Sequence, residues 1–179
     1  MTKGVGHMFT RDWLAVTGPQ ALRFFFERLK DVSEESGAPE SELLYNASML
    51  AHFASTSAAS TEDFPAAPTS LSAVFDTFVL DRSGHNDPDI LEAAASQCLL
   101  LTGFFCRQAR RRHNVDWYAA LGASYFRQAA QRANDWERAR MMRVMAGRFE
   151  FWRYQQDRLA RELQQTRLLL FQGTRKDAA

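Results

Sequence analysis

The chain has 179 residues, of which 46% are hydrophobic, so it is long enough for one domain with a sizeable core. It contains 26 Ala and 18 Leu against 7 Val and 1 Ile, a composition that favours helices and argues against a β-sheet. The formal net charge is only +1, although the charges are unevenly distributed. We therefore predict an all-α fold: one domain over residues 1–179, a helical bundle of six or seven helices with a long C-terminal helix.

The N-terminal part predicts two helices separated by a turn. Pro19 follows a glycine and suits a first helical position, where its missing N–H is not needed. Gly37 is expected to end this helix, and Pro39 to begin the next one. Glu40 and Glu42 then stand in a first turn, where acidic side chains favour the helix dipole.

Residues 55–70 are predicted to form a mobile loop, because seven of the sixteen are Ser or Thr and two are Pro. Asp87-Pro88 is a helix start signal, and we expect a helix over 88–112 that is buried on several sides. Asn114 is expected to cap the next helix. Asn134 or Asp135 is expected to cap the last one, predicted over 135–171.

The last predicted helix carries a heptad pattern of apolar residues, interrupted by Gln156 and Thr166. With about 37 residues it would be roughly 55 Å long, more than a domain of this size requires. We therefore expect a homodimer, and the alternative is that this helix packs within its own bundle. The candidate dimer seam consists of Phe149, Trp152, Leu159, Leu163 and Leu170.

No common catalytic motif occurs in the sequence. It lacks a Gly-rich phosphate loop, a His-Glu-x-x-His zinc motif, a Cys-x-x-Cys pair and a Gly-x-Ser-x-Gly nucleophile turn. His85 with Asp87 and Asp89, or His113 with Asp116, could form a metal site, but helix capping explains these residues better. The sequence thus favours a non-enzymatic protein with no catalytic residue, no metal and no cofactor.

Gly103 and Gly122 allow two interpretations. They could shape a small-ligand pocket between two helices, or they could let the helices cross closely, together with the small residues Ala119, Ala120, Ala123 and Ser124. Close packing is the interpretation that we prefer, and ligand binding stays open as an alternative function.

The distribution of charge is the most informative functional feature. Residues 1–92 contain 6 basic and 14 acidic residues, a net of −8, whereas residues 93–179 contain 16 and 7, a net of +9. The two halves could neutralise each other on folding. Alternatively, a basic face binds an acidic protein partner or, less favoured, nucleic acid. The candidate binding face consists of Arg107, Arg110, Arg111, Arg112 and His113.

Two cysteines, Cys98 and Cys106, are eight positions apart, which on one helix is about 12 Å and too far for a disulfide. Two buried thiols suit a reducing compartment. The N-terminus lacks a signal-peptide pattern, and the apolar run 98–106 is about half the length that spans a bilayer. We therefore predict a cytoplasmic protein that does not bind membranes.

Several segments resemble uncharacterised all-helical bacterial proteins. They are Tyr45-Asn46-Ala47-Ser48-Met49-Leu50-Ala51, the run from Ser96 to Phe105, Arg110-Arg111-Arg112, and the run from Val115 to Tyr125. The resemblance covers about half of the chain. It implies a bacterial source and implies no activity, cofactor or catalytic residue.

Overall fold

The computed structural model describes residues 19–59 and 75–176, with the backbone alone at 55–59, 75, 77, 78 and 166–176. Within these ranges it contains seven α-helices and no strand, which confirms the predicted all-α bundle. The helices are α2 (Pro19–Ser33), α3 (Glu40–Ala59), α5 (Pro88–Thr102), α6 (Cys106–Ala109), α7 (Val115–Arg132), α8 (Trp136–Gly147) and α9 (Phe149–Lys176). A 3-10 turn, η1 (Glu34–Ser36), follows α2, and a π-helical turn, η2 (Phe75–Leu80), precedes α5.

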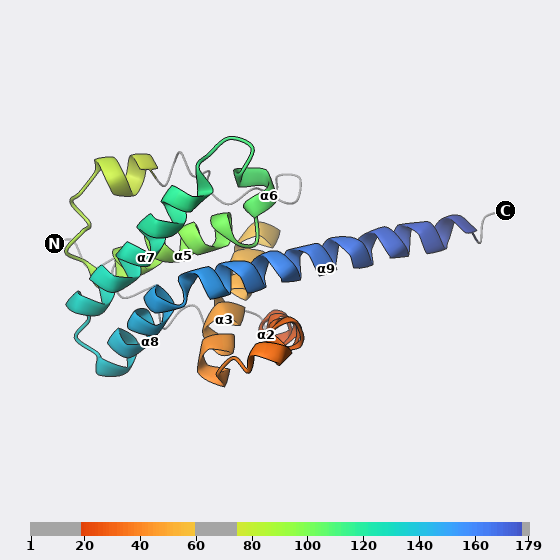
Figure 1. Cartoon of the computed structure of the whole chain (residues 1–179), viewed down its shortest axis with the longest axis horizontal. Helices are drawn as coiled ribbons and strands as arrows, with labels where there is room; N and C mark the ends of the chain where they lie inside the picture. The colour runs from red at the N-terminus through yellow and green to blue at the C-terminus, as the bar shows by residue number, and fades with distance from the viewer. Residues whose placement is uncertain (1–18, 60–74, 177–179) are drawn as a thin grey trace.

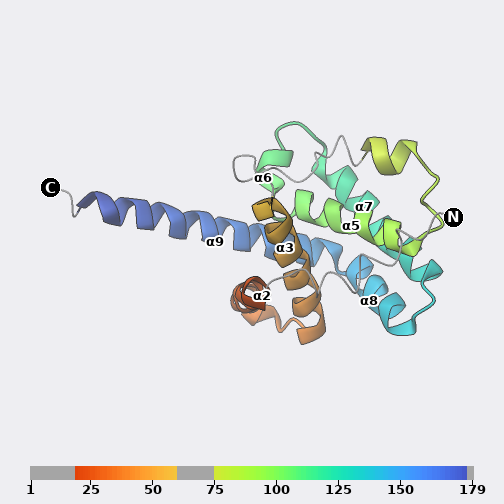
Figure 2. The ribbon, with the colours of Figure 1, turned by 180° about the vertical axis from the view of Figure 1, so that it is seen from behind.

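The helices form two groups that α9 connects (Figure 1). The first group is the pair α2 and α3, and in the second α7 packs against both α5 and α8. The beginning of α9 contacts helices of both groups, and its distal part then leaves the bundle, as both views show (Figure 2). None of the helices in the described ranges is long and apolar enough to cross a bilayer.

The inner face of α9 fills the centre of the bundle. Phe149, Trp152 and Leu159 are at most 2% exposed, and the Phe149 ring lies 6.1 Å from the ring of Phe126 on α7. Burial of side chains of this size is a main source of folding free energy. The proximal part of α9 is therefore a core element of the single chain.

The predicted helix starts are confirmed by their hydrogen bonds. The Asp87 carboxylate accepts the backbone N–H of Asp89 at 2.8 Å, and Asn114 Oδ1 accepts that of Trp117 at 3.2 Å. Of the two candidates for the last cap, Asp135 has this role, since its carboxylate accepts the N–H of Arg138 at 3.0 Å. Each bond satisfies a backbone donor that a helix start leaves without a partner.

The helix predicted over 88–112 is wrong in its second half, because α5 ends at Thr102 and only the single turn of α6 follows. The Thr102 carbonyl accepts a hydrogen bond from Arg153 Nε of α9 at 2.9 Å. A Cβ on Gly103 would lie 2.8 Å from the Leu99 carbonyl oxygen and 3.1 Å from the Arg153 carbonyl oxygen. The chain therefore turns where the backbone of α9 approaches it.

The single helix predicted over 135–171 is divided at Arg148, whose φ of −110° and ψ of 22° interrupt the regular helix. Arg148 Nη1 donates to Glu42 Oε1 of α3 at 3.2 Å, and its guanidinium lies 4.2 Å from the Phe151 ring centroid. Gly147 precedes it and has a low helix propensity. The break therefore coincides with a contact between helices far apart in sequence.

The mobile loop predicted at 55–70 is wrong over 55–59, because these residues continue α3. Residues 60–70 lie outside the described part of the chain.

Close packing is the correct interpretation at Gly122. A Cβ there would lie 2.6 Å from Cys98 Cβ and 2.7 Å from Phe149 Cζ, closer than real contacts allow. Helix α7 thus touches α5 and α9 at this point, and side chains occupy the space considered for a ligand. Burial also raises the pKa of the Cys98 thiol to about 12, so it is a packing residue rather than a reactive thiolate.

We expect Gly122→Ala to lower the free energy of unfolding by about 1–3 kcal/mol, because the added methyl group overpacks the crossing. Gly147→Ala is the matched control, since a Cβ there meets nothing within 4 Å. Ala has less backbone freedom than Gly in the unfolded chain, so Gly147→Ala should raise the free energy of unfolding by up to about 1 kcal/mol. Urea unfolding measures both. Equal stabilities for Gly122→Ala and the parent would contradict the close crossing.

Candidate functional site

The candidate surface consists of four side chains on α6 and the turn that follows, Arg107, Arg110, Arg111 and Arg112, here called the arginine cluster. The backbone of α6 is anchored by Cys106 and Ala109, which are buried. The turn is fixed because the N–H groups of Arg112 and His113 both donate to the Ala109 carbonyl, at 3.1 and 3.0 Å. The predicted grouping of these arginines is therefore a feature of an ordered backbone.

All four side chains of the arginine cluster are exposed. Arg107 Nη1 donates to Gln164 Oε1 of α9 at 3.4 Å, and Arg110 Nη2 lies 3.4 Å from Cys106 Sγ. Within the described residues, none of the four forms an ion pair with a carboxylate. The cluster thus presents four exposed guanidinium groups without a carboxylate partner in the described part of the chain.

His113 lies at the border of the arginine cluster. It is half-buried, and its ring meets the Tyr118 ring edge-on at 6.0 Å. The structure therefore brings the four predicted arginines together on one surface and places His113 beside them.

Other arginines of the C-terminal half are paired and partly buried. Arg138 of α8 contacts both Asp89 and Glu92 of α5, with Nε donating to Glu92 Oε2 at 2.9 Å. Tyr45 of α3 donates its hydroxyl to Glu92 Oε1 at 2.9 Å. Burial raises the pKa of Glu92, although the Arg138 guanidinium acts in the opposite direction. This contact joins three helices.

A second internal contact joins α3 to α9. Glu42 is 4% exposed, and it accepts Trp152 Nε1 at 2.7 Å in addition to the bond from Arg148. Next to it, Gln156 Nε2 donates to Asn46 Oδ1 at 3.1 Å, and both residues are fully buried. The polar interruption of the heptad pattern at Gln156 therefore has a polar partner inside the chain.

Arg153 is also buried, and it combines three contacts. Besides the Thr102 carbonyl, it bonds Asp116 Oδ1 from Nη2 at 2.9 Å and Glu150 from Nη1 at 3.2 Å. These bonds raise the pKa of its guanidinium against the opposing effect of burial. Neutralisation between the two halves thus applies to Arg138 and Arg148, Arg153 pairs with carboxylates of its own half, and the arginine cluster is included in neither.

The candidate dimer seam needs a correction. Phe149, Trp152 and Leu159 are buried by the other helices of the same chain, so they have no surface left for a second copy. Leu163 is half-buried and packs against the edge of the core. Leu170 lies in the part of α9 whose side chains are not described. A heptad pattern requires that something cover the apolar stripe, and here its proximal half is covered within the chain.

The residues considered for a metal have structural roles. Asp87 caps α5, Asp89 contacts Arg138 and Asp116 contacts Arg153. His85 meets the Tyr125 ring edge-on at 5.6 Å. Throughout 19–59 and 75–176, no three His, Cys, Asp or Glu side chains are grouped so that they could hold one metal ion.

Glu42 was not identified from the sequence as a buried residue. Its first-turn position predicts an exposed carboxylate that stabilises the helix dipole. A usable signal does exist one turn later, where the polar Asn46 interrupts the apolar stripe of α3 just as Gln156 interrupts that of α9. Polar residues inside two apolar stripes are expected to pair, because a buried amide without a partner is costly.

Comparison of the chain with models of protein families, with curated proteins and with solved structures finds no match. The functional assignment therefore depends on the arginine cluster and its surroundings.

Proposed function

We propose that this chain is a non-enzymatic, cytoplasmic protein-interaction module that binds an acidic partner through the arginine cluster. The observation that carries the proposal is the contrast between two sets of arginines. The partly buried set is paired with carboxylates or backbone carbonyls, whereas the exposed cluster has no carboxylate partner in the described chain. The planar guanidinium group matches a carboxylate with two parallel hydrogen bonds, and such bonds are strong.

Nucleic acid is the second candidate, since phosphates accept the same hydrogen bonds. Two features favour a protein. Helix α6 comprises the four residues Cys106–Ala109, too short to act as a recognition helix along a major groove. The cluster also occupies one turn rather than a groove that tracks a phosphate backbone.

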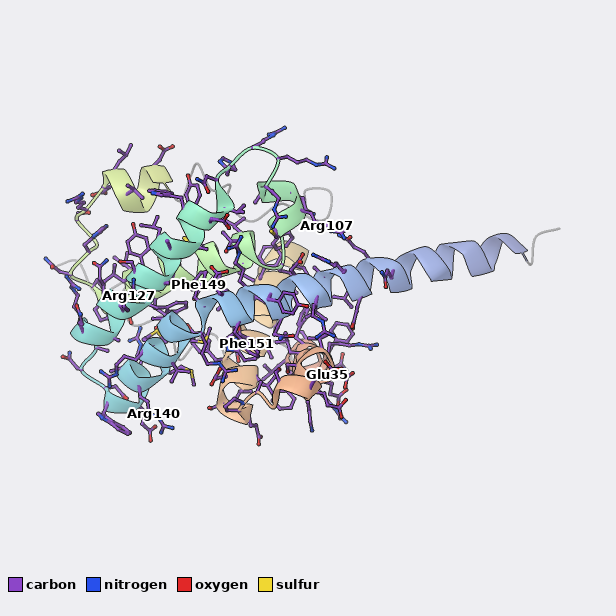
Figure 3. All side chains as sticks on the ribbon, in the orientation of Figure 1. Glu35, Arg107, Arg127, Arg140, Phe149 and Phe151 are labelled. Carbon is purple, nitrogen blue, oxygen red and sulfur yellow. The ribbon has the colours of Figure 1, made fainter. Side chains whose placement is uncertain are left out.

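The first test replaces Arg110, Arg111 and Arg112 together with Ala and measures binding of a fluorescent oligoglutamate peptide at low salt. We expect binding to weaken at least tenfold, because three of the four guanidinium groups of the cluster are lost. The control removes the same charge at Arg127, Arg140 and Arg143. These side chains are exposed and belong to α7 and α8, and Figure 3 shows Arg127 and Arg140 at the other end of the bundle from Arg107.

If the cluster and the control variant lose peptide binding equally, the arginine cluster is not a specific surface and the proposal fails. A duplex or single-stranded DNA of matched charge is measured in parallel. Tighter binding of DNA than of the peptide, with the same dependence on the cluster, would transfer the assignment to nucleic acid.

We also propose that the distal part of α9 forms a homodimer. Supporting this, the distal part of α9 leaves the bundle (Figure 1). The side chain of Gln164 still contacts Arg107. The remaining residues, 165–176, extend about 18 Å as a helix. Their sequence includes the apolar run Leu168-Leu169-Leu170-Phe171, and we expect an apolar run of this size to be covered by a partner.

Leu170→Asp should convert a dimer into a monomer that remains folded, because it places a charge in the proposed contact and leaves the buried residues Phe149, Trp152 and Leu159 unchanged. Gln165→Asp is the control, since it adds the same charge at an exposed position on α9. Light scattering at high micromolar concentration measures the mass. A monomeric parent, or a Leu170→Asp variant that stays dimeric, would contradict the proposed dimer.

A further inference from the structure

A second unpaired charged surface lies at the corner between α2 and α3. Its carboxylates are exposed, and within the described residues none of them forms an ion pair. The nearest basic residue in sequence is Lys30, which is also exposed. We call this surface the acidic corner; it consists of Asp31, Glu34, Glu35 and Glu40.

The backbone of the acidic corner is held in place by local bonds. Gly37 adopts the left-handed conformation with φ of 60°, and its N–H donates to the Glu34 carbonyl at 3.2 Å. Ser36 Oγ donates to the Ser33 carbonyl at 2.7 Å, and Ser33 Oγ to the Leu29 carbonyl at 2.6 Å. The corner therefore presents its carboxylates from an ordered turn, as the arginine cluster presents its guanidinium groups. Ordered surfaces lose less entropy on binding.

The two surfaces cannot neutralise each other within one chain. In Figure 3, Glu35 lies on one side of α9 and Arg107 on the other, and the ribbon views agree for η1 and α6 (Figure 2). Among the described residues, the carboxylates of the N-terminal half that do reach arginines of the C-terminal half are the internal ones, Glu42, Asp89 and Glu92. Folding thus leaves four acidic and four basic side chains on separate faces.

Each surface carries four like charges within ten residues of the sequence. Like charges repel each other when they lie within about one Debye length, roughly 10 Å at 0.1 M salt. A partner with the opposite pattern relieves this repulsion and forms hydrogen-bonded ion pairs. Both patterns are present on one chain, with equal numbers of charges. A second copy is therefore a complementary partner on charge alone.

We infer that the acidic partner of the arginine cluster is the acidic corner of a second copy of this chain. The inference rests on the proposed function, since it names the partner of the same surface. If a two-fold axis relates the copies, each cluster meets the other copy's corner and the dimer is closed. If no two-fold axis relates them, the same contact joins copies one after another into an open assembly. The contact is polar and separate from the apolar one proposed for distal α9, so salt should weaken it selectively.

The test uses two charge-reversed variants of the full chain. One carries Arg110→Glu, Arg111→Glu and Arg112→Glu, and the other carries Glu34→Arg, Glu35→Arg and Glu40→Arg. Each variant alone sets like charges against each other, so its dissociation constant for self-association should rise at least tenfold over the parent at low salt. In an equimolar mixture, the reversed cluster of one variant faces the reversed corner of the other. Assembly should then return to near the parent's level.

Sedimentation velocity at 20 mM and 300 mM salt measures the mass of parent, variants and mixture. The control reverses Arg127, Arg140 and Arg143 to Glu, and thermal melting checks that every variant is folded. A parent without salt-sensitive assembly overturns the inference, and so does either variant assembling like the parent or a mixture that does not recover.

Oligoglutamate binding separates this inference from the proposed function. If the reversed cluster loses the peptide while assembly is unchanged, the proposed function stands and only the identity of its partner is wrong.

Discussion

The fold depends on arginines of the C-terminal half that reach carboxylates of the N-terminal half inside the bundle. Arg138 lies between Asp89 and Glu92, and Arg148 meets Glu42 beside the indole N–H of Trp152. A buried charge without a partner is strongly unfavourable, so these helices can only adopt positions that keep the pairs together. The pairs thereby fix α8 and the start of α9 against α3 and α5.

The same pairs determine which charges remain outside. The chain is almost neutral as a whole, but its two halves carry opposite charge, and only part of that charge is used internally. Part of the remainder appears at two ordered places, the arginine cluster on α6 and the turn that follows, and the acidic corner between α2 and α3. Between them α9 passes from the core into solvent (Figure 1). The proposed interactions use the arginine cluster, the acidic corner and the distal part of α9 that leaves the bundle.

Features with local causes could be predicted from the sequence, and features that need distant partners could not. The caps at Asp87, Asn114 and Asp135 follow from residues one turn away. The breaks at Gly103 and Arg148 depend on contacts with other helices, so helical periodicity does not reveal them. A heptad stripe looks the same whether its own chain or a second one covers it. Likewise, the clustering of arginines was visible, but which arginines are paired was not.

The central claim is that Arg138 holds the fold together while the arginine cluster does not, and unfolding free energies measured against pH test it. Arg138→Leu should cost about 3–5 kcal/mol at pH 7, because it leaves buried carboxylates unpaired. Burial raises the pKa of Glu92 above its unfolded value, so the folded state binds this proton more tightly and its stability contribution grows as pH falls through the folded pKa. Since Arg138 lowers this pKa in the parent, the pKa should be higher still in Arg138→Leu. The variant therefore gains more stability in acid than the parent does, and the loss should shrink. Replacing Arg110, Arg111 and Arg112 with Ala should cost about 1 kcal/mol or less throughout. Equal losses for the two variants would contradict the account.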